Sequence, residues 1–210
     1  MFNGHWGVHK QDGSTPDSWH QYTCGFCGSK VSGAVVASQT FTTEGPGTPS
    51  GNRTHTVKWL QCTHCAFGSV WNDATIHPGV PFGPDLNGLP DDVSKAYQEA
   101  RRCMGVNAYT AAELICRKIL MHVAVEKAAK IGENFGSYIS YLEQNGYVTP
   151  PMKPWVELIR EHGNQSTHEL DTPNEQRAQS TVMFTAELLR LIYEMEHLAS
   201  KFASTAPATS

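Results

Sequence analysis

Two Cys-x-x-Cys pairs near the start of the chain restrict its fold more than any other feature. Cys24 and Cys27 form the first pair, and Cys62 and Cys65 form the second. Four thiolates from two tight turns complete the tetrahedral shell of one structural Zn²⁺, with each sulfur about 2.3 Å from the metal. We therefore expect one structural zinc ion per chain, bound by these four cysteines. A closed shell of four sulfurs leaves no position for a substrate.

Two other uses of paired cysteines remain open, namely a redox dithiol and two unrelated disulfides. A redox Cys-x-x-Cys normally opens a helix that follows a strand, and neither pair here precedes a helical pattern. The other two cysteines, Cys103 and Cys116, lie within helical pattern. His64, inside the second pair, is either a substitute ligand or an imidazole that faces solvent. The spacing favours metal binding, with His64 outside the shell.

The segment between the cysteine pairs predicts a β-hairpin with a long loop. Residues 30–42 and 53–60 are rich in β-prone side chains, whereas residues 44–51 hold Gly, Pro and Ser and must turn. Such a hairpin brings its two ends, each with one cysteine pair, side by side. We therefore expect a small β-rich zinc ribbon over residues 1–76 and a Pro/Gly-rich linker over residues 77–90.

Large aromatic residues surround the second cysteine pair. Trp59 and Trp71 flank it, Phe67 lies nearby, and Trp19 lies near the first pair. Exposed rings of this kind form stacking platforms for bases or surfaces for partners. A module this small also needs apolar filling, and the simpler expectation is that these four side chains supply it.

After the linker, the sequence changes to the 3.6-residue apolar period that is typical of helices. It predicts an all-α domain over residues 91–203 and a disordered tail over residues 204–210. Helices are expected at residues 91–104, 108–130, 135–144, 150–168 and 174–202. Asn107 is expected to cap the second of them. The predicted fold class is therefore α+β, with a small β-rich ribbon followed by a helical bundle.

Charge and hydropathy exclude several classes of function. The formal net charge is −4; residues 1–90 hold four Lys/Arg and five Asp/Glu, and residues 91–210 hold twelve and fifteen. A coat for long nucleic acids or a polybasic membrane anchor concentrates positive charge, so we expect neither, although a site for a few nucleotides fits this balance. We see no secretory h-region and no apolar run of roughly 18 residues, and so expect a cytoplasmic protein without membrane contact.

Three polar residues of the fourth expected helix are candidates for catalysis. Arg160, Asn164 and His168 are each four residues apart, so in one helix they lie within an arc of about 80° over roughly 12 Å. Histidine transfers protons, an arginine fork stabilises a pentavalent phosphate, and an amide orients either group. This trio has the chemistry to cleave RNA without a metal, with the ribose 2′-OH as nucleophile. The alternative is a hydrogen-bonded polar seam between helices.

Four segments of the helical half carry a family resemblance. They begin with Pro90-Asp-Asp-Val, Asn107-Ala-Tyr-Thr, Tyr138-Ile-Ser-Tyr and Ile159-Arg-Glu-His. In this order they resemble the prokaryotic family named domain of unknown function 4145. That family in turn resembles a branch of the HEPN superfamily of helical bundles, many of which are metal-independent ribonucleases in toxin–antitoxin and phage-defence systems. The resemblance implies a HEPN-like helical bundle.

The resemblance implies roles for particular residues. Arg160 and His168 correspond to the superfamily's Arg and His, with Asn164 as polar companion, although the seven residues between Arg160 and His168 exceed the usual gap. In active members, this helix pairs with the same helix of a second subunit. The resemblance therefore implies a homodimer, with RNA as ligand and a defence or toxin–antitoxin protein as partner. The implied function is RNA binding or metal-independent endoribonuclease activity; the alternative is a non-catalytic dimeric module that recruits such a partner. Glu113 and Arg117 either pair with each other or orient Arg160.

Overall fold

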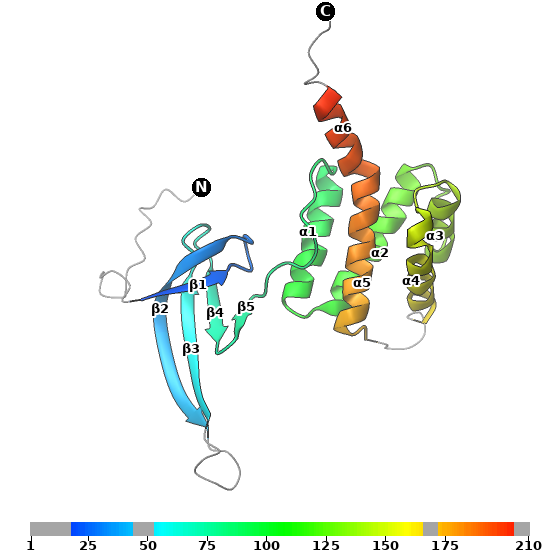
Figure 1. Cartoon of the computed structure of the whole chain (residues 1–210). Helices are drawn as coiled ribbons and strands as arrows, with labels where there is room; N and C mark the ends of the chain where they lie inside the picture. The colour runs from blue at the N-terminus through cyan, green and yellow to red at the C-terminus, as the bar shows by residue number, and fades with distance from the viewer. Residues whose placement is uncertain (1–17, 44–52, 166–171, 204–210) are drawn as a thin grey trace, which may run out of the picture. The chain divides into compact units, whose positions relative to one another are not determined.

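The chain divides into two compact units, residues 1–81 and residues 82–210 (Figure 1). The computed structural model describes residues 18–43, 53–165 and 172–203, so the predicted tail at 204–210 lies outside the described residues. The first unit is a β-sheet and the second is helical. The fold class is therefore α+β, as predicted.

An antiparallel five-stranded sheet forms the first unit. Its strands are β1 (Trp19–Thr23), β2 (Lys30–Thr43), β3 (Arg53–Gln61), β4 (Gly68–Asn72) and β5 (Thr75–His77). They are hydrogen-bonded in chain order, so β3 lies at the centre. Strands β2 and β3 form the predicted long hairpin, with Thr42 opposite Thr54 and Ala34 opposite Gln61. Strands β1, β4 and β5 extend this hairpin on both sides.

One face of the sheet builds a small apolar core. Side chains alternate between the two faces along a strand, and the register places Leu60 of β3 between Val35 of β2 and Ser69 of β4. These three residues are 2%, 7% and 4% exposed. Tyr22 covers Gly33 on the same side, where a Cβ atom would lie 2.4 Å from the tyrosine ring. The glycine therefore makes room for an aromatic ring across the strand pair.

Six α-helices make up the second unit in the part of the chain that the structure describes. They are α1 (Asp91–Gly105), α2 (Tyr109–Glu126), α3 (Phe135–Gln144), α4 (Lys153–Gln165), α5 (Glu175–Leu189) and α6 (Met195–Ala203). A 3-10 turn, η2 (Pro150–Met152), precedes α4, and a π-helical turn, η3 (Arg190–Glu194), joins α5 to α6. The last predicted helix is thus one continuous segment with a π-helical turn inside it.

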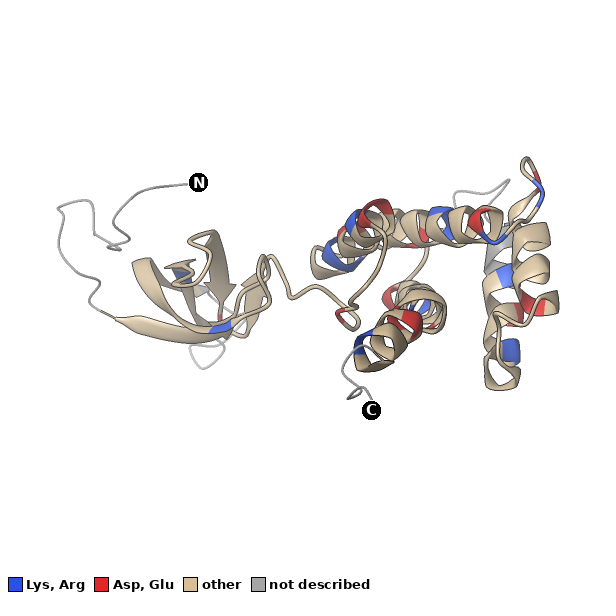
Figure 2. Ribbon diagram, turned by 90° about the horizontal axis from the view of Figure 1, so that it is seen from above, with Lys and Arg blue, Asp and Glu red and all other residues tan. Residues whose placement is uncertain are grey.

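The helical unit encloses one apolar core around α2, which packs against α1, α3 and α5. Large side chains that are fully buried there are Tyr97, Leu120, Val123, Ile139, Leu142, Val156, Val182, Phe184, Leu188 and Leu189. Each contributes about 1.5–3 kcal/mol when it is removed from water. Charged residues also concentrate on this unit (Figure 2), which holds twelve Lys/Arg and sixteen Asp/Glu against four and four in residues 1–81. Within the described residues, no helix is long and apolar enough for a membrane span.

Asn107 ends α1 and does not cap α2, so that prediction is wrong. Its φ angle of 60° is left-handed, a conformation that asparagine tolerates better than most residues. The Asn107 N–H donates to the Met104 carbonyl at 3.1 Å, and the Ala108 N–H donates to the Cys103 carbonyl at 2.8 Å. These bonds close the C-terminus of α1, and Ala108 is the N-cap of α2.

The second half of the Pro/Gly-rich segment packs on the helical unit. The Tyr97 hydroxyl donates to the Pro84 carbonyl at 2.9 Å. Asn87 donates its backbone N–H to a Glu194 carboxylate oxygen at 2.8 Å. Residues 82–90 are therefore fixed to the helical unit by contacts with both α1 and η3.

Candidate metal centre and exposed aromatic face

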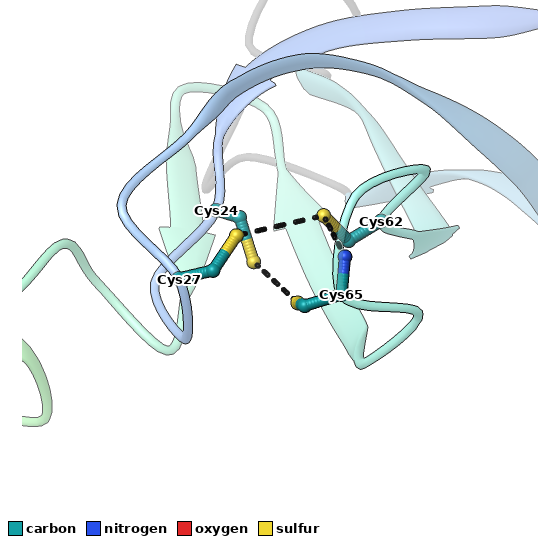
Figure 3. A group of neighbouring side chains, drawn as sticks. All are labelled: Cys24, Cys27, Cys62 and Cys65. Carbon is teal, nitrogen blue, oxygen red and sulfur yellow. Dashed lines mark hydrogen bonds between the residues drawn. The ribbon is translucent and has the colours of Figure 1, made fainter. Parts of the chain in front are cut away.

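The four predicted cysteine ligands converge in the first unit (Figure 3). Cys24 Sγ lies 3.7 Å from Cys65 Sγ, and Cys27 Sγ lies 3.9 Å from Cys62 Sγ. All four sulfurs lie within 4.8 Å of one another, and His64 is not a member of this cluster. Bonds of about 2.3 Å to a tetrahedral metal set S–S separations of about 3.8 Å, so the four thiols fit a metal ion.

The S–S separations also bear on the alternative uses of these cysteines. A disulfide has an S–S bond of about 2.05 Å, and all six cysteines are free. The four sulfurs form a single cluster drawn from both pairs. This arrangement matches one shared metal site and is compatible with a zinc ribbon.

Two turns with the same hydrogen bond carry the cysteines. The Gly28 N–H donates to the Cys24 carbonyl at 2.8 Å, and the Ala66 N–H donates to the Cys62 carbonyl at 2.9 Å. Gly28 and Ala66 both have left-handed φ angles, 70° and 66°. Glycine adopts this conformation readily, whereas alanine does so at a cost of about 1–2 kcal/mol. The second turn therefore keeps its geometry despite the missing glycine.

Backbone N–H groups point at the first sulfur of each pair. The Phe26 N–H lies 3.4 Å from Cys24 Sγ, and the His64 N–H lies 3.4 Å from Cys62 Sγ. Donors placed in this way stabilise negative charge on sulfur. The turns are therefore suited to holding thiolates, the form of cysteine that binds metals.

The chain after β5 packs against the first turn. A Cβ atom at Gly25 would lie 2.1 Å from the Pro78 carbonyl oxygen and 2.6 Å from that of Gly79. Both obstacles are backbone atoms, so no side chain fits at Gly25. The first cysteine turn is therefore supported by the end of the sheet.

Large aromatic side chains are exposed on the face of the sheet opposite its core. Trp59 on the central strand β3 is 41% exposed, and Trp19 on β1 is 56% exposed. Phe41 on β2 is 43% exposed and stacks on His55, with ring centroids 5.4 Å apart. The strand registers place Trp19, Phe41 and Trp59 on the same face. We call these three residues the aromatic face.

A hollow of about 370 Å³ lies beside Trp59. Val36, which is 46% exposed at a bulge in β2, and Val70 of β4 contribute to its lining. Near the metal centre, Phe26 and Phe67 stack with ring centroids 4.7 Å apart and are 44% and 58% exposed. Val36 and Val70 therefore extend the apolar surface around Trp59.

The prediction that the aromatic residues near the second cysteine pair fill the interior is wrong for Trp19, Trp59 and Phe67. Trp59 precedes the buried Leu60, and strand alternation turns it to the opposite face. Trp71 does lie half-buried, with its ring 4.8 Å from the His20 ring and 4.8 Å from Lys58 Nζ. Sequence reasoning identified the right residues, but it assigned three of them to the wrong environment.

Arg160 of the predicted catalytic trio points from α4 to α3. Its Nη2 donates to Glu143 at 2.8 Å and to Ser140 Oγ at 3.0 Å, and its Nη1 donates to Glu157 at 2.7 Å. The Arg160 side chain is 23% exposed. Its positive charge is therefore balanced by two carboxylates, and the side chain ties α3 to α4.

The side chains of the other two members of the trio lie outside what the structure describes. Asn164 belongs to the last turn of α4, and its side chain lies outside what the structure describes. His168 lies outside the described residues altogether. The shared stripe of Arg160, Asn164 and His168 therefore stays a prediction.

Glu113 forms a long-range ion pair that sequence reasoning missed. Its carboxylate accepts from Arg177 Nε at 2.9 Å and from Arg177 Nη2 at 2.8 Å. The two side chains are only 6% and 11% exposed. Arg117, its neighbour on α2, lies over the Phe135 ring at 4.6 Å. Sequence spacing could not reveal the pair, because its partners are 64 residues apart.

These features define a chain with a cluster of four cysteines, compatible with a metal site, in a small sheet, and with a separate helical unit. The family described as Domain of unknown function (DUF4145) matches residues 98–205, just over half of the chain, so the chain belongs to this family. No curated protein and no solved structure matches the chain. The match begins within α1 and covers the later helices, so it concerns the helical unit and leaves out the sheet.

Proposed function

We propose that this protein binds single-stranded RNA and that the aromatic face of the sheet is the contact surface. The observation that supports this most is Trp59, which is 41% exposed although it lies on the central strand. Unpaired bases stack on exposed aromatic rings, and each such contact contributes about 1–3 kcal/mol. The 370 Å³ hollow beside Trp59 offers a place for a neighbouring base.

Charge favours the sheet over the helical unit as the contact surface. Residues 1–81 hold four Lys/Arg and four Asp/Glu, whereas residues 82–210 hold twelve and sixteen. Asp73 is engaged by His55 at 2.6 Å. The helical unit holds more acids than bases (Figure 2), and it would repel a phosphate backbone. The balanced charge of the sheet unit suits a site for a few nucleotides and not for a long duplex.

We further propose that the metal is zinc and that its role is structural. A tetrahedral set of four thiolates selects zinc or an iron–sulfur centre, and the separations within the cluster suit a single ion. Bound zinc would fix the ends of β1, β2, β3 and β4 relative to one another, and so hold the aromatic face in shape. Metal analysis of the purified protein should give one zinc per chain, and Cys62→Ser should lose it.

Cleavage of RNA is the second candidate function. In this proposal His168 is the general acid and base, Arg160 stabilises the phosphate and Asn164 orients them, within a HEPN-like bundle that pairs with its copy. Membership of the family supports it through the resemblance described above. The ion pairs of Arg160 with Glu143 and Glu157 favour instead a non-catalytic module that recruits a defence or toxin–antitoxin protein. We therefore place RNA binding ahead of cleavage.

Binding is tested by fluorescence anisotropy of the zinc-loaded full chain with a labelled single strand of about 12 nucleotides. Trp59→Ala should raise the dissociation constant about fivefold or more, which corresponds to about 1 kcal/mol. The matched control is Ile131→Ala, which removes a side chain that is 79% exposed in the helical unit, and it should bind as the wild type does. Equal affinity of Trp59→Ala and wild type, or no binding by the wild type, would contradict the proposal.

Cleavage is tested separately with the same zinc-loaded chain and no added divalent metal. His168→Ala and Arg160→Ala should abolish product formation, whereas Glu157→Gln should retain it. If the wild type leaves RNA intact, or if all variants cut equally, the trio is not catalytic. Binding through the aromatic face is unaffected by that outcome.

A further inference from the structure

The C-terminal helix carries exposed apolar residues at regular spacing. Leu191 in η3 is 42% exposed, and Met195 and Leu198 in α6 are 53% and 37% exposed. Phe202 continues the spacing and is 70% exposed. No side chain of α6 is buried, and the helix projects beyond the rest of the helical unit (Figure 1). We call these four residues the C-terminal seam.

The spacing of the seam indicates what kind of surface covers it. Met195, Leu198 and Phe202 follow one another in steps of three and four, which places them within an arc of about 60° on α6. Leu191 precedes Met195 by four residues, across the π-helical turn. A stripe this narrow, with a period of 3.5, is the pattern of two helices that wrap around each other.

We propose that a second copy of this chain covers the C-terminal seam, so that two α6 helices pair as a short two-stranded coiled coil. Leu191 and Leu198 occupy one set of alternating seam positions, and Met195 and Phe202 occupy the other. Leucine is the residue that two-stranded coiled coils use at the first set, the d positions of a heptad. In a symmetric dimer, the seam of one copy packs against the seam of the other, so a single apolar stripe forms both halves of the interface.

Charges beside the seam are compatible with pairing of identical helices. Glu194 flanks the seam, but its carboxylate is held by Arg190 Nε at 3.1 Å and by the Asn87 N–H at 2.8 Å. Lys201 lies on the same flank and carries the opposite charge, and the other flank holds Ile192 and Ala199, which are uncharged. Repeated like charges at these flanking positions would oppose self-pairing, and a partner of opposite charge would require them. The flanks therefore favour a second copy over a strongly charged partner.

This interface is distinct from the one that the family resemblance implies, in which the helix bearing Arg160 pairs with its copy. It also does not depend on RNA binding, because the seam and the aromatic face belong to different units. The two interfaces, one through the helix bearing Arg160 and one through the C-terminal seam, would be disrupted by different substitutions.

Sedimentation velocity of the zinc-loaded full chain over a range of concentrations tests the proposal. The wild type should dimerise, and Leu198→Glu and Met195→Glu should each raise the dissociation constant by about tenfold or more. Leu114→Glu on α2 is the matched control, since it also places a charge at an exposed leucine, here 57% exposed, and it should leave the dimer intact. Circular dichroism should show unchanged helix content in all three variants, because these side chains are exposed in the single chain.

Three results would overturn the proposal. The first is a wild type that remains monomeric at about 100 µM. The second is a dimer that survives both seam substitutions. The third is a dimer that Leu114→Glu weakens as much as Leu198→Glu does. A dimer that only Arg160→Ala dissociates would assign the interface to α4 instead.

Discussion

The sheet and the helical unit are stable for different physical reasons. In the helical unit, a continuous apolar core draws buried side chains from α1 to α5. In the sheet, the buried apolar residues outside the cysteine turns are Ala34, Val35 and Leu60, among the described residues. A module with so little core needs another source of folding energy, and a structural zinc supplies of order 10 kcal/mol. A structural metal, as proposed for the four cysteines, would allow the sheet to leave Trp19 and Trp59 outside its core.

Removal of the metal should reveal the largest difference in stability between the two units. A strong chelator should unfold the sheet and release its zinc, while the helical signal in circular dichroism persists, because the helical core does not depend on the metal. Cys62→Ser should behave like chelation, whereas Cys103→Ser, in α1, should not. Loss of the helical signal together with the metal, or a sheet that stays folded without it, would contradict this comparison.

Loss of the buried ion pair should affect only the helical unit. Glu113→Gln leaves the Arg177 guanidinium without its carboxylate in a site where both side chains are largely buried. Such a loss costs about 3–5 kcal/mol, measurable by urea unfolding followed through helix content. Glu157→Gln, at a side chain that is 70% exposed, is the control and should cost less than about 1 kcal/mol. Equal effects of the two substitutions would show that the pair is not a main support of the bundle.

Acid should weaken the contact between Glu194 and the segment before α1. Hydrogen bonds, first from the Asn87 backbone and then from Arg190, lower the pKa of Glu194 below its ordinary value of 4.5. Because the folded-state pKa is the lower one, the contact stabilises the fold above pH 4.5, and this contribution is lost as pH falls through the folded-state pKa. The stability difference between wild type and Glu194→Gln should therefore shrink between pH 7 and pH 3. The exposed Glu196→Gln provides the control, and a gap that widens on acidification would contradict the assignment.

The two cysteine turns offer the smallest and most local test. Ala66→Gly should stabilise the zinc-bound sheet by roughly 0.5–1 kcal/mol, because glycine adopts the left-handed conformation without strain. Gly28→Ala should destabilise it by about 1–2 kcal/mol. The thermal midpoint of the sheet, followed by tryptophan fluorescence, measures both changes. A lower midpoint for Ala66→Gly would mean that the φ angle of this turn does not limit its stability.

Local signals in the sequence were sufficient for the clustering of the four cysteines and for much of the secondary structure. Two Cys-x-x-Cys pairs are enough to predict a shared site, because the spacing itself suits metal binding. The bounds predicted for α3 match because Asn134 caps its start and Asn145-Gly146 follows its end. The prediction that Asn107 caps α2 was wrong because asparagine is common both at helix starts and at left-handed helix ends.

Information that depends on tertiary structure could not be read in the same way. Trp59 and Leu60 are adjacent and both apolar, so the pattern of β3 does not tell which of them faces water. The partner of Glu113 lies 64 residues away. Exposure of the aromatic face and pairing of Glu113 follow from strand register and helix packing, which no local motif encodes.

The claim that the aromatic face is the RNA surface is tested most directly by the indole N–H signals of a ¹⁵N-labelled, zinc-loaded chain titrated with single-stranded RNA. The indoles of Trp19 and Trp59 should shift, whereas those of Trp71, on the opposite face, and Trp155, whose Nε1 donates to Ser180 at 2.6 Å, should stay in place. Shifts at Trp71 or Trp155 without shifts at Trp19 and Trp59 would contradict the account.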